Sequence, residues 1–199
     1  MEKIIIRLII IVALFFATYT ALQQIDWITL FNVEKITSKT EEKLGDLFWD
    51  VINQHEKEIT DVNIVIPIDS IISKICKANN INTDQIKLHI VDKNEINAFA
   101  LPGKHLILFS GLIKSSENEE ELCGVICHEI AHMEKDHVAK KLVKEIGLSV
   151  LISSTVGNSS PEIISEAIKL LSSTAYDRNM EQEADIGAVD YMINANINP

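Results

Sequence analysis

The feature that most constrains the fold of this chain is a pair of histidines, four residues apart, inside a segment with helical patterning. The segment reads Cys127-His-Glu-Ile-Ala-His132. Residues four apart lie on one side of a helix, so His128 and His132 can bind one Zn²⁺ ion, whereas Glu129 is offset and can contact the metal's water. The apolar residues with helical spacing around this segment are Leu122, Val125, Ile126 and Ile130. We therefore expect a helix that carries two zinc ligands and a catalytic base, with Ser116 and Glu119 forming a capping box at its start.

A catalytic zinc ion needs a third protein ligand and an open position for water. His137 does not fit the pattern HExxHxxGxxH, because it follows His132 by five residues and would point about 140° away from it if the helix continued. We expect His137 to lie at the surface or at a helix end. The better source of the ligand is the downstream acidic segment Arg178–Asp185, which contains Glu181, Glu183 and Asp185.

The two segments together carry a resemblance to a known family. His128-Glu-Ile-Ala-His132, followed about fifty residues later by Glu181-x-x-Ala184-Asp185, resembles the HtpX/BepA group of gluzincin zinc metallopeptidases, which are kin to the CAAX prenyl endopeptidase and to a mitochondrial quality-control protease. The similarity extends over residues 35–199. It includes the segments Asn97–Gly103, Ser110–Leu112 and Asn196–Pro199.

The resemblance implies a role for each carboxylate of the acidic segment. It implies that Glu181 is the third zinc ligand and that the Asp185 carboxylate holds a ligating histidine in place. The spacing agrees, since residues four apart share a helix face, while Glu183 is rotated by about 200° from Glu181 and should point elsewhere. We expect one Zn²⁺ per chain. Tyr176 and Arg178 are candidates for stabilising the transition state.

The remaining patterns predict an α+β fold, mostly helical and of the zincin type, with a small β-sheet or hairpin. Residues 34–55 have the spacing of an amphipathic helix, and Pro67 is suited to the first turn of a second helix. Residues 87–91 are predicted to form a strand, and residues 97–101 and 105–109 a hairpin around Pro102-Gly103. The edge formed by Asn97, Ala98, Phe99 and Ala100 is a possible binding strand for an extended substrate. Further helices are expected after Pro161 and around Met180–Met192.

The N-terminus predicts a membrane anchor over residues 1–25, ahead of a metallopeptidase domain at 34–199. Lys3 and Arg7 precede an apolar run from Leu8 to Leu22. The positive-inside rule then places the domain on the extracytoplasmic, periplasmic side. Secretion after signal cleavage and a position on the cytoplasmic face are the alternatives.

The charge of the chain limits its partners. With 18 Lys and Arg against 29 Asp and Glu, the net charge is -11, so binding to nucleic acid is not expected. Cys76, Cys123 and Cys127 are expected to be free thiols.

These inferences predict a zinc-dependent metalloendopeptidase for membrane-associated quality control, acting on unfolded or damaged proteins and peptides. An alternative is a non-catalytic, chaperone-like or adaptor protein of the same fold. A structural helical domain in which the motif is a coincidence is a third reading.

Overall fold

The computed structural model describes residues 2–23, 38–155, 160–173 and 176–199, and the chain divides into two compact units, Met1–Lys35 and Ile36–Pro199. The first unit contains helix α1 (Glu2–Gln23). In the described part of the chain, no helix combines the length and the apolar character needed to cross a bilayer. The membrane anchor predicted at residues 1–25 stays a prediction. Residues 24 and 25, and residues 34–37 of the predicted first domain helix, lie outside the described residues.

The second unit is built around a three-stranded sheet, which confirms an α+β fold that is mostly helical. Its strands are β1 (Lys87–Val91), β2 (Ala98–Leu101) and β3 (His105–Phe109), in the order β1-β3-β2. Strand β3 is central and fully buried, pairing in parallel with β1 and antiparallel with β2. The predicted hairpin is thus confirmed, and β2 is an edge strand.

The hairpin turn spans the three residues between the strands and contains the predicted Pro102-Gly103 pair. The 3-10 turn η3 (Pro102–Lys104) holds Gly103 at φ 67° and Lys104 at φ 60°. Gly103 also lies against the backbone of α3, where an added Cβ would come within 2.7 Å of the Glu42 Cα. The glycine is therefore needed both for its backbone conformation and for the close approach.

Two helices precede the sheet. Helix α3 (Ser38–His55) buries Leu44, Phe48 and Ile52, as the amphipathic pattern predicted. Helix α4 runs from Val62 to Ala78. It therefore begins five residues before Pro67, contrary to the prediction. Asp61 explains the earlier start, because its carboxylate accepts a hydrogen bond from the Asn63 N–H and caps the first turn.

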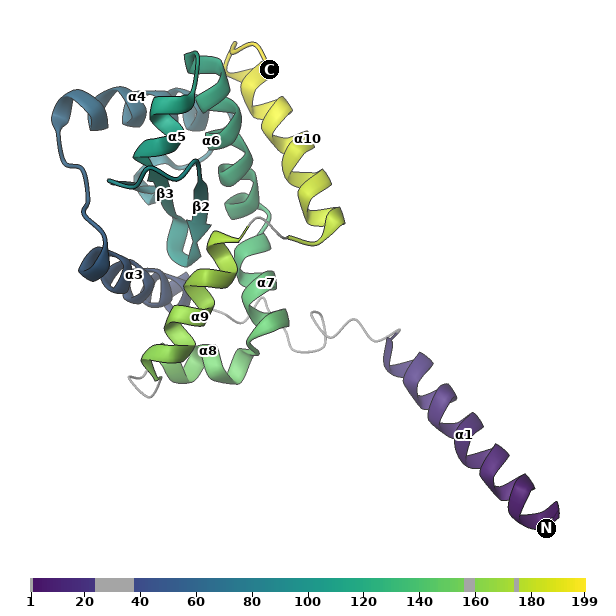
Figure 1. Cartoon of the computed structure of the whole chain (residues 1–199). Coiled ribbons are helices and arrows are strands. Elements are labelled where there is room, and N and C mark those ends of the chain that lie inside the picture. Colours follow the sequence, from purple (N-terminus) through teal and green to yellow (C-terminus); the bar gives the residue numbers. More distant parts are fainter. Residues whose placement is uncertain (1, 24–37, 156–159, 174–175) are drawn as a thin grey trace. The chain divides into compact units, whose positions relative to one another are not determined.

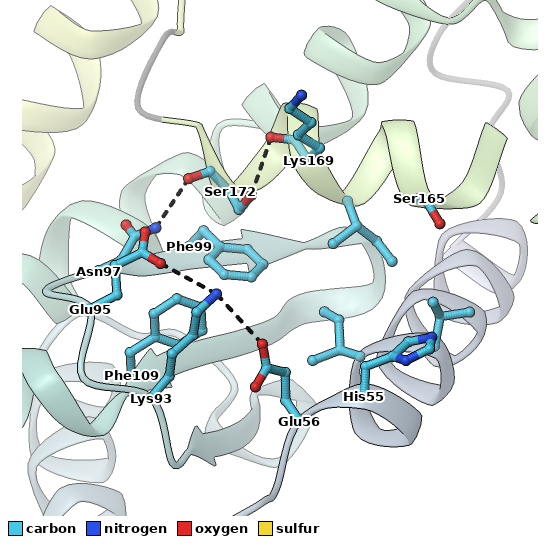
Figure 2. Close-up of a pocket in the computed structure, with 13 residues that line it drawn as sticks. His55, Glu56, Lys93, Glu95, Asn97, Phe99, Phe109, Ser165, Lys169 and Ser172 are labelled. Atoms are coloured by element: carbon cyan, nitrogen blue, oxygen red, sulfur yellow. Dashed lines mark hydrogen bonds and ion pairs between the residues drawn. The ribbon is translucent and has the colours of Figure 1, made fainter. Parts of the chain in front are cut away.

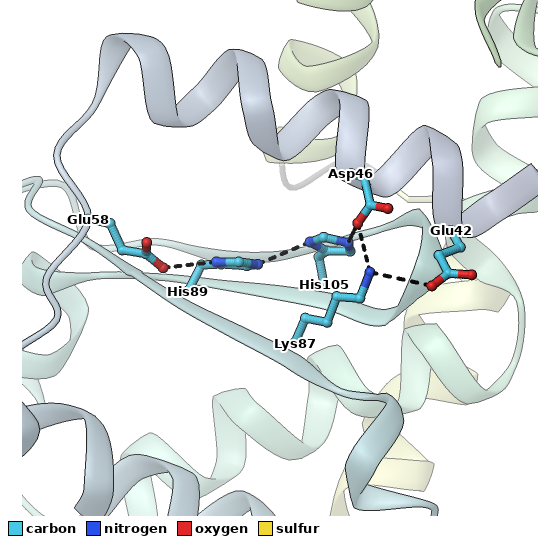
Figure 3. Close-up of polar contacts among 6 residues, drawn as sticks. All are labelled: Glu42, Asp46, Glu58, Lys87, His89 and His105. Atoms are coloured by element: carbon cyan, nitrogen blue, oxygen red, sulfur yellow. Dashed lines mark hydrogen bonds and ion pairs between the residues drawn. The ribbon is translucent and has the colours of Figure 1, made fainter. Parts of the chain in front are cut away.

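A polar network joins α3 to the sheet (Figure 3). Glu58 Oε1 lies 2.9 Å from His89 Nδ1, and His89 Nε2 lies 3.0 Å from His105 Nδ1. At the other end, the His105 Nε2 atom lies 3.2 Å from Asp46 Oδ1, and the Lys87 ammonium donates to the same carboxylate at 2.7 Å. Two imidazoles are thus held inside the fold, between carboxylates at both ends.

The rest of the unit is helical. The elements are η2 (Thr83–Gln85), α5 (Ser110–Ser115), α6 (Glu119–Glu134), α7 (His137–Glu145), α8 (Leu148–Thr155), α9 (Pro161–Ser172) and α10 (Arg178–Asn194). The cap of α6 is Asn118, whose side chain accepts from the Glu121 N–H, and not the predicted Ser116. In Figure 1, α6 and α10 lie side by side on one side of the sheet, while α3, α8 and α9 cluster on the other.

Helices α6 and α10 approach each other closely. At their contact, a Cβ added to Gly187 would lie 3.0 Å from the Ala131 Cβ and 3.3 Å from the Lys135 Cε. Ala131 and Ala184 are both fully buried. Small residues at the crossing therefore let the backbones come together, and this brings the acidic segment of α10 beside the histidines of α6.

Candidate metal centre

Helix α6 presents the two histidines of the motif to one point. The Nε2 atoms of His128 and His132 lie 3.0 Å apart. His132 is completely buried, whereas the His128 side chain is 24% exposed. The helix therefore places one imidazole inside the fold and the other at the edge of a cavity.

Helix α10 adds Glu181 to this point. Its Oε2 atom lies 3.5 Å from His128 Nε2, and its Oε1 atom accepts a hydrogen bond from the Tyr176 N–H at 3.2 Å. One ligand atom from each of His128, His132 and Glu181 falls within 4.8 Å of the others. The structure thus brings together the three residues that the sequence analysis expected to bind a metal.

The donor set fits zinc. Two imidazole nitrogens and one carboxylate oxygen are a known catalytic zinc set, and tetrahedral bonds of about 2.0–2.1 Å place neighbouring ligand atoms about 3.3 Å apart. The separations of 3.0 Å and 3.5 Å bracket this value. The third pair, His132 and Glu181, lies within 4.8 Å, so the three residues are close enough to hold one ion.

Asp185 lies behind His128. Its Oδ1 atom is 3.0 Å from His128 Nδ1, the nitrogen on the opposite side of the ring from Nε2. A carboxylate at this nitrogen fixes the tautomer and the direction of a ligating imidazole. This is the position that the sequence analysis expected for Asp185.

His137 lies at a helix end, one of the two positions expected for it. It is the first residue of α7 and is 1% exposed, so it is at a helix end but not at the surface. Helix α6 ends at Glu134, and the left-handed backbone of Asp136 (φ 56°) turns the chain back. The helical projection from His132 therefore does not apply, and His137 Nδ1 lies 3.0 Å from His132 Nδ1.

Glu183 completes this arrangement. As expected, it does not join the three candidate ligands, but its Oε2 atom lies 3.3 Å from His137 Nε2. A chain of contacts thus runs from Glu183 through His137 to His132. Residue spacing did not predict this chain of contacts, because the link depends on the turn at Asp136.

Glu129 is buried at the bottom of the site. Burial, and to a lesser extent the charge of Glu181, raise the pKa of its carboxyl to about 8, against the effect of a backbone hydrogen bond from Ala100. A metal cation at the neighbouring ligands would lower this pKa again. Glu129 can therefore both accept and release a proton near neutral pH.

His132 is held in its neutral form. Burial, and then the neighbouring His128 and His137, lower its pKa to about 3. Because only a neutral imidazole can bind a metal ion, this environment favours metal binding.

The two candidate transition-state residues are separated by the fold. Tyr176 stacks on His132, with ring centroids 4.0 Å apart, and its buried hydroxyl has no hydrogen-bond partner among the described residues. Arg178 is exposed at the first turn of α10. Lys141, which the sequence analysis did not single out, lies 4.1 Å above the Tyr176 ring. Tyr176 is thus the candidate that faces the site.

A cavity of about 130 Å³ opens over these groups. Its lining includes three of the four residues of the predicted substrate edge, Asn97, Ala98 and Phe99, together with Tyr176 and Glu181. The other lining residues are His128, Glu129, His132, Leu171, Ser172 and Ser173. The edge of β2 therefore runs directly past the histidines.

The combination of a His-Glu-x-x-His helix, a carboxylate from a second helix and an adjacent edge strand defines the architecture of a metallopeptidase domain. The sequence model of Peptidase family M48 matches residues 67–199, and the chain belongs to this family.

The curated proteins that the chain resembles are named as proteases, in agreement with this family. The chain is 34% identical to the Beta-barrel assembly-enhancing protease of Yersinia pestis over 77 residues, covering 39% of this chain and 16% of the relative. It is 30% identical to the protein of the same name in Escherichia coli over 103 residues (51% and 21%), and 27% identical to the Mitochondrial metalloendopeptidase OMA1 of Arabidopsis thaliana over 110 residues (55% and 23%). The matched region spans only 16–23% of the length of these three relatives.

Proposed function

We propose that this protein is a zinc-dependent metalloendopeptidase that hydrolyses peptide bonds in unfolded or damaged proteins. The observation that carries the proposal is the convergence of His128, His132 and Glu181, with ligand atoms within 4.8 Å of one another, above the buried carboxyl of Glu129. The family membership supports the same chemistry.

The protein's own groups divide the reaction between them. Bound zinc would supply Lewis acidity, polarising the attacking water and the scissile carbonyl. Glu129 takes the proton of the water and delivers it to the leaving amine. Asp185 and His137 hold the imidazoles of His128 and His132 in their ligating orientations.

The free edge of β2 offers a backbone template for the substrate. The Phe109 N–H donates to the Asn97 carbonyl, so Asn97, Phe99 and Leu101 direct their backbone groups toward β3. The backbone groups of Ala98 and Ala100 then face the free edge, and the Ala100 hydrogen bond to Glu129 agrees with this direction. An extended peptide can pair there through main-chain bonds, which select for an unfolded backbone more than for a sequence.

The cellular role follows from this selectivity and from the relatives. We propose protein quality control as the setting, since one relative is named for assisting beta-barrel assembly and another as a mitochondrial endopeptidase. The extracytoplasmic location and the membrane association stay predictions from Lys3 and Arg7.

Metal analysis combined with peptide hydrolysis tests the proposal. The purified chain should bind one zinc ion and cleave an unfolded protein, and a chelator should abolish cleavage. Glu129→Gln should keep the metal and lose activity by orders of magnitude, because only the proton transfer is removed. Glu120→Gln, an exposed residue on the same helix, is the matched control and should be fully active.

Two results would contradict this assignment. Hydrolysis by Glu129→Gln at the normal rate would show that another group is the base. A zinc-bound wild-type protein that binds unfolded chains without cleaving them would support the chaperone-like alternative.

A further inference from the structure

A second cavity, of about 290 Å³, lies beside the metal centre. It is enclosed by the C-terminal end of α3, the β2-β3 hairpin and α9 (Figure 2). Its apolar lining consists of Val51, Ile52, Phe99, Phe109 and Ile168. Phe99 and Phe109 meet edge to face, with ring centroids 5.7 Å apart, and form its floor.

This cavity adjoins the one over the metal ligands. Asn97, Phe99 and Ser172 line both. The Asn97 side-chain amide donates to the Ser172 carbonyl at 3.1 Å, which ties the start of β2 to the end of α9 (Figure 2). A peptide paired with the β2 edge would then lie within reach of both cavities.

One charged side chain lies over part of the apolar floor, and its charge is neutralised by its neighbours. The Lys93 ammonium lies 3.3 Å from a Glu95 oxygen and 3.6 Å from a Glu56 oxygen, and 4.7 Å above the Phe109 ring. Its charge is thus balanced by two carboxylates. His55 and Lys169 are exposed. The favoured occupant is an apolar group that covers the aromatic floor.

We propose that this cavity is the subsite for a bulky apolar side chain of the substrate, at a fixed position from the cleaved bond. The inference rests on the proposed endopeptidase function and deepens it. The volume of about 290 Å³ lies at the lower limit for pockets that take whole small molecules, so it is large enough for one bulky side chain. Leu, Ile, Phe and Met are buried in folded proteins and exposed in unfolded ones, so the subsite makes cleavage depend on unfolding.

Cleavage of a peptide library by the zinc-loaded protein tests the subsite. We expect enrichment of bulky apolar residues at one position, on one side of the cleaved bond. The exposed Ser165 lines the cavity, so Ser165→Trp should fill it without disturbing the core. The ratio of kcat/KM for a peptide with Phe at this position to that for one with Gly should then fall by about tenfold or more.

Glu166→Trp is the matched control, since Glu166 is an exposed neighbour on α9 that does not line the cavity. It should keep the preference for Phe. A library without enrichment, or a preference that survives Ser165→Trp, would overturn the subsite and leave the endopeptidase proposal standing.

A binding measurement separates the subsite from catalysis. Fluorescence anisotropy with the Glu129→Gln variant should show tighter binding of the Phe peptide than of the Gly peptide, and adding Ser165→Trp should remove the difference. If this is observed but the wild-type protein cleaves nothing, the subsite is supported and the catalytic proposal fails. Equal binding of the two peptides to Glu129→Gln overturns the subsite.

Discussion

His137 Nδ1 lies 3.0 Å from Nδ1 of His132, the ring nitrogen that faces away from the other candidate zinc ligands. Through its second nitrogen, His137 reaches the Glu183 carboxylate at 3.3 Å. Each candidate histidine ligand is thus backed by its own partner, Asp185 behind His128 and His137 behind His132. Helices α7 and α10 both contribute to holding a site whose histidines lie on α6.

The first prediction separates the two glutamates of α10. Glu181→Ala should lose the metal and the activity, because it leaves two histidines as ligands. Glu183→Ala should still bind zinc, with an affinity about tenfold lower, since it loses a partner of His137 rather than a ligand. Competition titration with a zinc chelator measures the zinc affinity of both variants. Gln182→Ala is the control, because Gln182 is exposed and lies between the two glutamates in the sequence. The opposite order of effects would exclude Glu181 as the third ligand.

The second prediction concerns the contact between α6 and α10. Gly187→Val should destabilise the protein by about 1–3 kcal/mol, because the new side chain meets Ala131 and Lys135. It should also weaken zinc binding by displacing Glu181. Gly124→Ala is the control: its Cβ would meet only the Met192 sulfur at 3.8 Å, so it should stabilise α6 by about 0.5–1 kcal/mol. Urea denaturation of the metal-free variants gives both values, and an unchanged stability in Gly187→Val would contradict the close packing.

A third prediction distinguishes Tyr176 from Arg178. The buried Tyr176 hydroxyl lacks a partner among the described residues, and burial raises its pKa, so it stays protonated and can donate to a developing oxyanion. Tyr176→Phe should lower kcat by about 10²-fold, the usual effect of losing one such donor, with little change in KM or in zinc content. Arg178→Gln should be nearly neutral. Steady-state kinetics on a defined peptide decides, and a larger loss in Arg178→Gln would reverse the assignment.

The fourth prediction concerns acid stability and the network of Figure 3. Burial lowers the pKa of His105 to about 4 and also lowers that of His89. In the unfolded chain the histidine pKa is about 6.5, above the folded-state value. The contribution of the neutral histidine to the free energy of unfolding is therefore complete above pH 6.5 and is lost as the pH falls toward 4. One such proton gives a slope of up to about 1.4 kcal/mol per pH unit in the free energy of unfolding.

The matching experiment is urea denaturation between pH 7 and pH 4. His105→Gln should flatten the pH dependence relative to the wild type, and His55→Gln, at an exposed position, should not. The opposite result would be a wild-type protein that becomes more stable on acidification and a His105→Gln variant that does not. It would mean that the carboxylates of Glu58 and Asp46 raise the pKa of His105 more than burial lowers it.

Periodicity predicted much of the fold. Helix α3, strand β1 and the β2-β3 hairpin follow directly from the spacing of apolar residues and from the Pro102-Gly103 pair. Helix starts were less accurate, because they depend on single side-chain contacts. Asp61 and Asn118 cap α4 and α6, and both positions differ from those chosen on proline and capping-box patterns.

The sequence by itself determined which residues gather at the candidate site, since the i, i+4 spacing on a helix fixes the common face of His128 and His132, and that of Glu181 and Asp185. Tertiary structure alone decided how these two faces meet and what lies behind them. The close crossing of α6 and α10 at Gly187 determines how the two faces meet. The left-handed turn at Asp136 brings His137 to His132. Helical periodicity ends where a helix ends, so contacts made across a turn or between packed helices are not encoded in residue spacing.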